Sequence, residues 1–515
     1  MLKSFKRQAT FLGLSLTLCM PGIARADIWH QWLNGLTKAG YQVQAGAAFV
    51  TTVSYCKKFV VPLFHTCFNS DASDPYVIPL VPVAGSYIDP YFGQFSSYTL
   101  PNGTVVGQDF RLGTNEAVLL VVNLPPTGGY FSYQNYVFSR LKSDYANPGT
   151  GYQSPDPARD VMYATYGNSV NNTAISDQSG LGFGGGQVAF ISTANSDLIA
   201  DVTKRFQQVG GNPKLLFPDP MGKNINFGTT SQADDFSILF RYLVPENASA
   251  GKKWLKQADI NVQVFRITQP ASLGTKQFPT DVLRDRSYNV DVSGYASDMT
   301  ELNNLLSTWL ATQESGGNIK AVQANPSMTA NSAGTPQTGS VGPFCLEKDR
   351  LCFGDQQDAI HWGGYVGPVQ NGQLFIVDGV NPASTGNTDV LSLNLENASK
   401  SVGLTALSQT NPSATGFNNG GVLTGSAELA LKTLGLWNSA SPQLQAAAPN
   451  LYVHLFTRGC TSAQTYCTAS FVSPIPVTQI PYQDNVSVEF RAYGLPNSVT
   501  GPNPYYVAAP YVIHD

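Results

Sequence analysis

The sequence is poor in charge. Of its 515 residues only 12% are Asp, Glu, Lys or Arg, against about 25% in an average globular protein. No basic cluster follows the first residues, so the electrostatic footprint of a nucleic-acid-binding protein is missing. The sequence also lacks the ~20 consecutive apolar residues that a transmembrane helix needs. Disorder is disfavoured, because 42% of the residues are apolar and 11% are aromatic.

The N-terminus has the three-part pattern of a secretory signal peptide. Its first residues carry three positive charges, at Lys3, Lys6 and Arg7. An apolar stretch follows over residues 9–20 and is too short to span a bilayer. Small residues at Ala24 and Ala26 then predict cleavage before Asp27. We therefore expect residues 1–26 to be removed, and the mature chain to be secreted or periplasmic.

Seven cysteines are present, and one of them, Cys19, lies in this leader. An even number behind a signal peptide predicts disulfide bonds in an oxidising compartment. We expect each cysteine to pair with its near neighbour in sequence. The expected pairs are Cys56 with Cys67, Cys345 with Cys352, and Cys460 with Cys467. The wide spacings do not match zinc-ligand patterns.

Hydrophobic periodicity predicts a mainly β fold with an α/β insertion, in two β-sandwich or jelly-roll-like halves. Period-two and short apolar runs predict strands, and i, i+3, i+4 spacing predicts helices over 29–36, 197–209 and 299–312. The expected organisation is an N-terminal β-rich domain (27–187), an α/β subdomain with two helices (188–313), a Gly/Ser/Asn-rich linker or long loop (314–343) and a C-terminal β-rich domain (344–515).

One short pattern occurs twice. A buried strand over 117–124 is followed by Pro and Gly and then by an alternating strand that ends at Ser139. Residues 373–397 repeat this order, with Asn381-Pro382 and Gly386 in the turn. One interpretation is internal duplication. The alternative is that β-hairpins with such turns look alike by chance.

Two common catalytic motifs, those of serine hydrolases and zinc proteases, are missing. The chain has only five histidines, and it contains neither G-x-S-x-G nor H-E-x-x-H. The densest polar stretch follows Cys352 and contains Asp355, Asp358, His361 and Trp362. On a helix the two carboxylates and the imidazole would share a face and act as a general base or hold a cation such as calcium. The alternative is a capped turn in which Asp side chains bind backbone amides.

Aromatic side chains alternate along the segment 130–138. Tyr130, Tyr133 and Tyr136 would stack against a sugar or polymer if they were exposed. If they are buried, they are ordinary β core, because strands favour aromatic residues.

These observations lead to one hypothesis and one alternative. The hypothesis is an exported hydrolase that acts on a neutral glycan or polymer, with Asp355, Asp358 and His361 as catalytic residues and Trp362 as a binding residue. The alternative is a non-catalytic carbohydrate-binding or cell-envelope interaction protein that uses the tyrosines. No cofactor is expected apart from a structural cation, and the sequence leaves the oligomeric state open.

Overall fold

The computed structural model describes residues 27–515, except for 66, 69–74, 85–97, 143–155, 157, 223, 280–281, 285, 287–290, 317–319, 322–328, 331–340, 349–350, 353, 401, 409–418, 461–463, 503–510 and 514–515. The predicted signal peptide therefore lies outside the described residues, as does most of the predicted linker.

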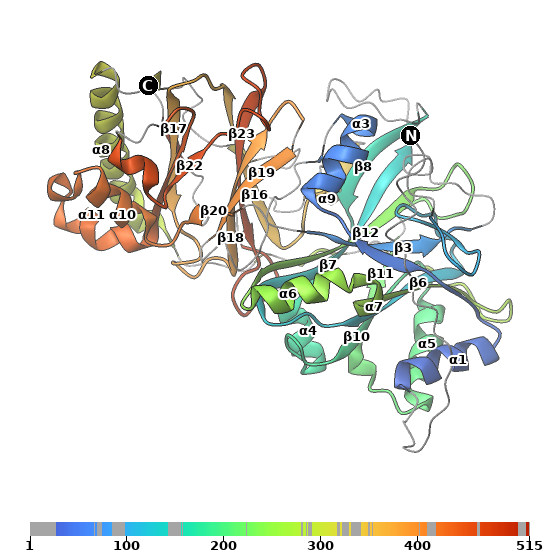
Figure 1. The fold of residues 1–515 in the computed structure, drawn as a ribbon. Helices are drawn as coiled ribbons and strands as arrows, with labels where there is room; N and C mark the ends of the chain where they lie inside the picture. The colour runs from blue at the N-terminus through green and yellow to red at the C-terminus, as the bar shows by residue number, and fades with distance from the viewer. Residues whose placement is uncertain are drawn as a thin grey trace, which may run out of the picture.

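The protein is mainly β, as predicted, and has two lobes (Figure 1). The strands of the N-terminal lobe are β1 (Gln42–Ala45), β2 (Ala47–Val50), β3 (Val77–Pro82), β4 (Tyr98–Thr99), β5 (Val105–Gly107), β6 (Glu116–Asn123), β7 (Gly128–Leu141), β8 (Arg159–Thr165), β9 (Val170–Asn171), β10 (Gln187–Thr193), β11 (Leu216–Pro220), β12 (Asp235–Pro245) and β13 (Val262–Thr268). Those of the C-terminal lobe are β14 (Lys320–Ala321), β15 (Thr329–Ala330), β16 (Ala359–Pro368), β17 (Gln373–Val380), β18 (Val390–Asn397), β19 (Val402–Ser408), β20 (Asn419–Val422), β21 (Leu451–Thr457), β22 (Val472–Pro474), β23 (Asn485–Tyr493) and β24 (Tyr511–Ile513).

Each lobe contains an outer sheet and an inner sheet. In the N-terminal lobe the outer sheet has the order β1-β13-β6-β10-β11, and the inner sheet has the order β4-β5-β3-β12-β7-β8. In the C-terminal lobe the orders are β14-β17-β21-β22 and β15-β16-β23-β18-β19-β20. The two sheets of a lobe bury apolar side chains between them. Leu120 and Phe190 of one outer sheet share a core cluster with Phe131 and Phe240 of the facing inner sheet.

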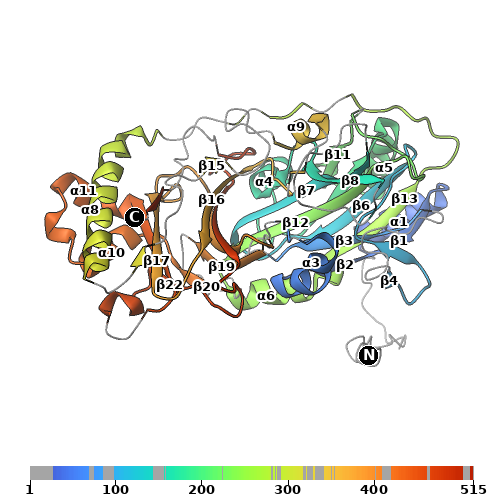
Figure 2. The same ribbon diagram turned by 90° about the horizontal axis from the view of Figure 1, so that it is seen from above.

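Helices cover the outer face of each outer sheet, and shorter helices lie elsewhere. The α-helices are α1 (Ile28–Lys38), α2 (Val53–Tyr55), α3 (Val61–Phe64), α4 (Asn172–Ser179), α5 (Ser196–Gln208), α6 (Ala248–Lys256), α7 (Ala258–Asn261), α8 (Ala296–Ser315), α9 (Val341–Lys348), α10 (Ser426–Thr433) and α11 (Pro442–Ala447). Helices α1 and α5 pack on one outer sheet, and α8, α10 and α11 pack on the other. These two helical layers lie at opposite ends of the molecule (Figures 1 and 2). The inner sheets therefore lie between them.

Local sequence accounts for the main helices. Helix α5 begins where the Asn195 side chain accepts a hydrogen bond from the backbone N–H of Asp197, which satisfies one of the free amides of the first turn. Its apolar side chains at Leu198, Val202 and Phe206 recur at helical spacing and are fully buried. The predicted helices over 29–36, 197–209 and 299–312 correspond to α1, α5 and α8.

The lobes share their strand pairings in chain order. In the N-terminal lobe β6 pairs antiparallel with β10 and β13, and β10 pairs parallel with β11. In the C-terminal lobe β17 pairs in the same way with β21 and β24, and β21 pairs with β22. The inner sheets also correspond, because β7 lies between β12 and β8 as β18 lies between β23 and β19.

A side-chain bridge recurs at matching places. Arg140 near the end of β7 binds Asp234, the residue before β12. Asn397 at the end of β18 binds Asp484, the residue before β23. The strands of the sequence echo, 117–139 and 373–397, occupy equivalent positions in this scheme. These correspondences fit the interpretation of the echo as internal duplication, which stays a prediction.

The structure divides the chain differently from the expected subdomains. Residues 188–267 supply β10 to β13, which complete both sheets of the N-terminal lobe instead of forming a separate insertion. Helix α8 was grouped with that segment. It packs instead on the C-terminal lobe, where Leu302 and Leu306 share a cluster with Leu374 and Ile376 of β17. Periodicity identifies a helix but does not say which sheet it covers.

The three disulfide bonds join the cysteines as predicted: Cys56 to Cys67, Cys345 to Cys352, and Cys460 to Cys467. They fit a β-rich protein made for an oxidising compartment. In the described part of the chain, no helix has the length and apolarity needed to cross a membrane.

Replacing Leu120→Ala in the N-terminal core should lower the free energy of unfolding by about 2–5 kcal/mol, because the cavity adds to the lost burial. Leu120 is fully buried, whereas Leu429 on α10 is 41% exposed. Urea unfolding of the oxidised protein measures both variants. A loss of the same size in Leu429→Ala would contradict the placement of the core.

Candidate functional site

The polar stretch after Cys352 lies along the N-terminal lobe, before the chain returns to the C-terminal lobe at β16. Helix α9 packs on β8, and the Cys345–Cys352 disulfide ties the end of this helix to the following loop. The backbone N–H of Cys352 donates to the Met162 carbonyl, and the N–H of Gly354 donates to the Tyr163 carbonyl. The loop is therefore fixed to the edge of β8. We call residues 354–358 the joint segment.

Glycine is required at the start of this segment. Gly354 has φ +72°, a conformation that side chains other than glycine rarely adopt, and an added Cβ would lie 2.9 Å from the Tyr163 ring. After this turn, the side chains of Asp355, Gln356 and Asp358 contact strands β8 and β7 of the inner sheet.

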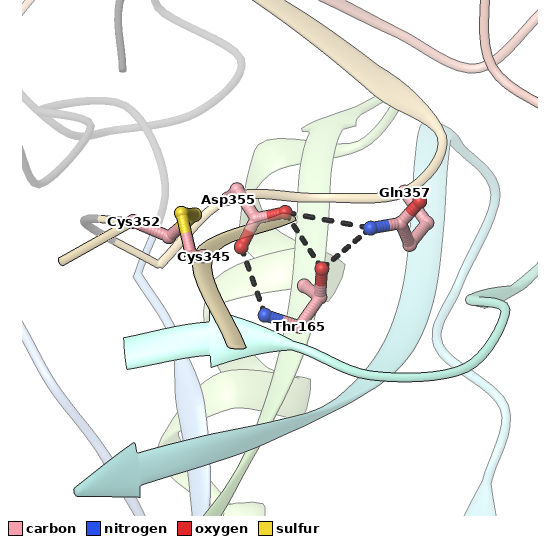
Figure 3. The surroundings of a disulfide bond; sticks show 5 residues. All are labelled: Thr165, Cys345, Cys352, Asp355 and Gln357. Carbon is pink, nitrogen blue, oxygen red and sulfur yellow. Dashed lines mark hydrogen bonds between the residues drawn. A yellow bond between two sulfur atoms is a disulfide. The ribbon is translucent and has the colours of Figure 1, made fainter. Parts of the chain in front are cut away.

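Asp355 is held by Thr165 of β8 (Figure 3). Its carboxylate accepts hydrogen bonds from the Thr165 backbone N–H at 2.8 Å and from the Thr165 hydroxyl at 2.6 Å. Gln357 donates to the same hydroxyl at 2.6 Å. Burial raises the pKa of Asp355 from 3.8 to about 6, because the hydrogen bonds from Thr165 offset only part of the desolvation.

Asp358 binds a tyrosine of β7. The Tyr130 hydroxyl donates to the Asp358 carboxylate at 2.6 Å. Gln356 donates from its side-chain nitrogen to the Tyr130 hydroxyl, to the Ser132 hydroxyl and to the Asp358 carboxylate, at distances of 2.8–3.0 Å. These side chains are at most 6% exposed. These side chains therefore bind one another within the protein and face no solvent, and the second carboxylate oxygen of Asp358 has no hydrogen-bond partner among the described residues.

Arg241 of β12 supplies the positive charge in this network. Its guanidinium donates to the Tyr136 hydroxyl at 2.7 Å, to the Gln356 side-chain oxygen and to the Gly354 carbonyl. A buried guanidinium is tolerated only when its donors are satisfied. Two of these acceptors, on Gln356 and Gly354, belong to the joint segment, and the third belongs to β7. The N-terminal sheet and the joint segment therefore depend on each other.

A second arginine fastens the joint segment from the other side. The Arg286 guanidinium donates to the carbonyls of Gln357, Ala359 and Pro502, each at 2.9 Å. Burial lowers its pKa to about 10, and the nearby Asp358 carboxylate opposes that effect. Arg286 therefore links the joint segment to the chain that follows β23.

The lobes meet beside this network through apolar contacts. Tyr130 and Leu243 of the N-terminal lobe share a small cluster with Ala359, Val390 and Tyr493 of the C-terminal lobe. The rings of Tyr130 and Tyr493 lie 5.5 Å apart between centroids. The junction between the two lobes is therefore formed by both polar and apolar contacts.

His361 does not share a helical face with the two carboxylates, because it lies on strand β16. Its partner is Glu489 of β23, at 3.4 Å from the imidazole Nδ1. Trp362, the next residue on the strand, points to the opposite side and is buried in the C-terminal core. The proposed face of Asp355, Asp358 and His361 is therefore not formed, and Trp362 offers no exposed ring for stacking.

The three tyrosines of β7 are fully buried. Tyr130 and Tyr136 point into the junction. Tyr133 points to the other face, where its hydroxyl contacts Ser192 and Asp219 inside the sandwich. The exposed platform that carbohydrate stacking requires is absent at these residues, because β7 is covered on both faces.

Sequence reasoning missed Arg241, Gln356 and Thr165. The sequence contained a signal for Arg241, because this residue is the one charge in the apolar run FSILFRYLV of 236–244. A charged residue in a buried strand needs partners, and the polar stretch after Cys352 supplied them. Which segment would meet this strand could not be read from periodicity.

Among the described residues, no group of three or more His, Cys, Asp or Glu side chains could hold a metal ion. A structural cation such as calcium, the alternative that the sequence left open, therefore has no candidate ligand set in that part of the chain.

Comparisons with known proteins assign no family. No family model matches the chain, and no curated protein matches it. Among solved structures, an uncharacterised protein from Burkholderia cenocepacia is similar at 8% identity, with a TM-score of 0.35, over 95% of this chain and 88% of its own. A protein from Vibrio parahaemolyticus is similar at 9% identity, with a TM-score of 0.30, over 79% of this chain and 88% of its own.

Replacing Tyr130→Phe should destabilise the protein by about 1–3 kcal/mol, because the buried Asp358 carboxylate and the Gln356 amide each lose a partner. The matched control is Tyr365→Phe, because Tyr365 is 54% exposed. Chemical unfolding measures both changes. Equal, small effects in the two variants would contradict a structural role for the Tyr130 hydroxyl.

The buried Asp355 should make stability fall as pH rises. Its folded pKa of about 6 lies above the unfolded value, so the folded state binds this proton more tightly. That contribution is present below about pH 4 and is lost as pH rises through 6. In Asp355→Asn it is absent at every pH.

The free energy of unfolding of Asp355→Asn relative to wild type should therefore rise by on the order of 2–3 kcal/mol between pH 4 and pH 7. Asp389, whose pKa burial also raises to about 6, is common to both proteins and cancels in the difference. Urea unfolding across this range gives the values. A pH-independent difference would show that Asp355 is not protonated in the folded protein.

Proposed function

We propose that this protein acts outside the cytoplasm as a non-catalytic binding protein, and that residues 354–358 are a structural joint between its lobes. The proposal follows the alternative drawn from the sequence. In this proposal, the polar stretch that first suggested an enzyme has a structural role and does not carry the function.

One observation carries the proposal. Asp355, Gln356 and Asp358 are buried and bind Thr165, Tyr130 and Arg241 across the junction. A catalytic acid or base must reach a substrate proton within hydrogen-bond distance. Side chains that already hold two parts of the fold together would have to break those contacts first, which would cost stability.

Export is supported by composition and covalent structure. The three disulfides fit an oxidising compartment. The leader pattern of residues 1–26 and the low content of charged residues point in the same direction.

A hydrolase is the second candidate, and one pair of residues favours it. His361 is oriented by the Glu489 carboxylate, which is the arrangement of a general base held in one tautomer. Against this role, the Nε2 atom of His361 is buried and has no hydrogen-bond partner among the described residues. A substrate would reach it only after the covering chain moved.

The test is turnover. The full chain, purified with its disulfides intact, should release no reducing ends from neutral polysaccharides such as amylose, cellulose, chitin or β-1,3-glucan. The expected rate equals that of His361→Asn, which removes the imidazole that would act as the base. Hydrolysis by the wild type that disappears in His361→Asn would overturn the proposal and establish the second candidate.

A further inference from the structure

We infer that a groove on the N-terminal lobe binds a neutral glycan. This inference rests on the proposed binding function and gives it a site and a ligand class. The groove has a volume of about 670 Å³, within the range of about 300–1,000 Å³ that is usual for ligand sites. Its lining comprises Thr114, Arg140, Leu141, Ile225, Asn226, Phe227, Thr230, Gln232, Ala233 and Gln277.

The groove lies at one edge of the lobe, away from the joint segment. The loop between β11 and β12 supplies most of its wall, and the end of β7, the residues before β6 and Gln277 after β13 supply the rest. The loop is anchored at its base, where the backbone N–H of Asn226 donates to the Asp234 carboxylate at 3.0 Å. The wall is therefore built on strands that the core holds in place.

The groove carries no uncompensated charge among its described lining residues. Arg140 is the one ionised side chain in that lining, and it binds Asp234 through two contacts of 3.0 and 2.8 Å. Its remaining donors reach the carbonyls of Leu346 and Asn224. Asp234 is fully buried, and its carboxylate balances the positive charge of Arg140. The pair therefore adds no net charge to the groove. Among the described lining residues, a phosphate or carboxylate ligand would therefore find no uncompensated cation.

Uncharged polar side chains in the wall are uncommitted. Within the described part of the chain, the side chains of Thr114, Thr230, Gln232 and Gln277 make no hydrogen bond. Amide and hydroxyl groups both donate and accept, which matches the hydroxyls of a sugar. In the joint segment, by contrast, the amide side chains of Gln356 and Gln357 are already hydrogen-bonded to other residues of the protein.

An aromatic ring completes the wall. Phe227 lines the groove and is half-buried. Its ring stacks on Phe236, at 5.9 Å between centroids, and this contact holds it in place. A fixed aromatic ring suits the apolar face of a pyranose. The combination of one ring, free amides and hydroxyls, and balanced charge selects a neutral carbohydrate over an anionic one.

The experiment is calorimetric titration of the full oxidised chain with maltohexaose, cellohexaose and chitohexaose, and with hexagalacturonate as the anionic probe. We expect at least one neutral probe to bind and the anionic probe to bind at least tenfold more weakly. Phe227→Ala should weaken the neutral interaction about tenfold, which corresponds to about 1.4 kcal/mol. Gln232→Ala should weaken it about threefold to tenfold.

Two controls keep the result interpretable. Gln207→Ala removes an exposed amide on α5, outside the groove, and should leave the affinity unchanged. Phe227→Ala also removes the contact with Phe236 and can lower stability, so Gln232→Ala, at an exposed position, tests the site without touching the core. Circular dichroism checks that each variant is folded.

The inference is overturned if no neutral probe binds, if the anionic probe binds more tightly, or if the affinity is the same in Gln232→Ala as in wild type. Failure of the proposed function is a separate result, because it appears as hydrolysis of a polysaccharide. A protein that cleaves glycans yet binds them in this groove would overturn the non-catalytic proposal and support the groove.

Discussion

The junction of the two lobes depends on one buried guanidinium. Arg241 lies in an apolar strand, and its charge is acceptable there only because Tyr136, Gln356 and the Gly354 carbonyl receive its hydrogen bonds. Those acceptors come partly from β7 and partly from the segment that leads into the C-terminal lobe. The arginine therefore requires the joint segment to be docked on the N-terminal sheet, because a buried charge without partners would cost more than any single contact here contributes.

This requirement explains why the joint segment is polar. A loop that covers a buried charged strand must supply hydrogen-bond acceptors, and Asp355, Gln356 and Asp358 supply them or hold the groups that do. The Cys345–Cys352 disulfide restricts the same loop, which reduces the conformational entropy lost when it docks. The residues that resemble a catalytic cluster in sequence are thus explained by packing. The groove beside Gln232 differs, because the side chains of Thr114, Thr230, Gln232 and Gln277 make no hydrogen bond within the described part of the chain.

The two lobes have the same arrangement of sheets and helices. Both place an outer sheet under helices and an inner sheet toward the middle, and Arg140–Asp234 and Asn397–Asp484 bridge matching corners. In the first lobe the bridge borders the groove. The same strand pairings thus accommodate different side chains at the sheet edges, and in such folds binding properties reside in the loops.

Much of the local structure followed from sequence alone. Apolar spacing predicted α5 and α8, alternation predicted β7, a short apolar run predicted β17, and nearness in sequence predicted the disulfide partners, because these features depend on residues close together in the chain. The location of α8, the burial of Tyr130 and the partners of Asp358 did not follow. They depend on which faces meet across long sequence separations, such as the 228 residues between Tyr130 and Asp358. Only the tertiary structure decides that, because periodicity shows that a face is apolar or polar and not what covers it.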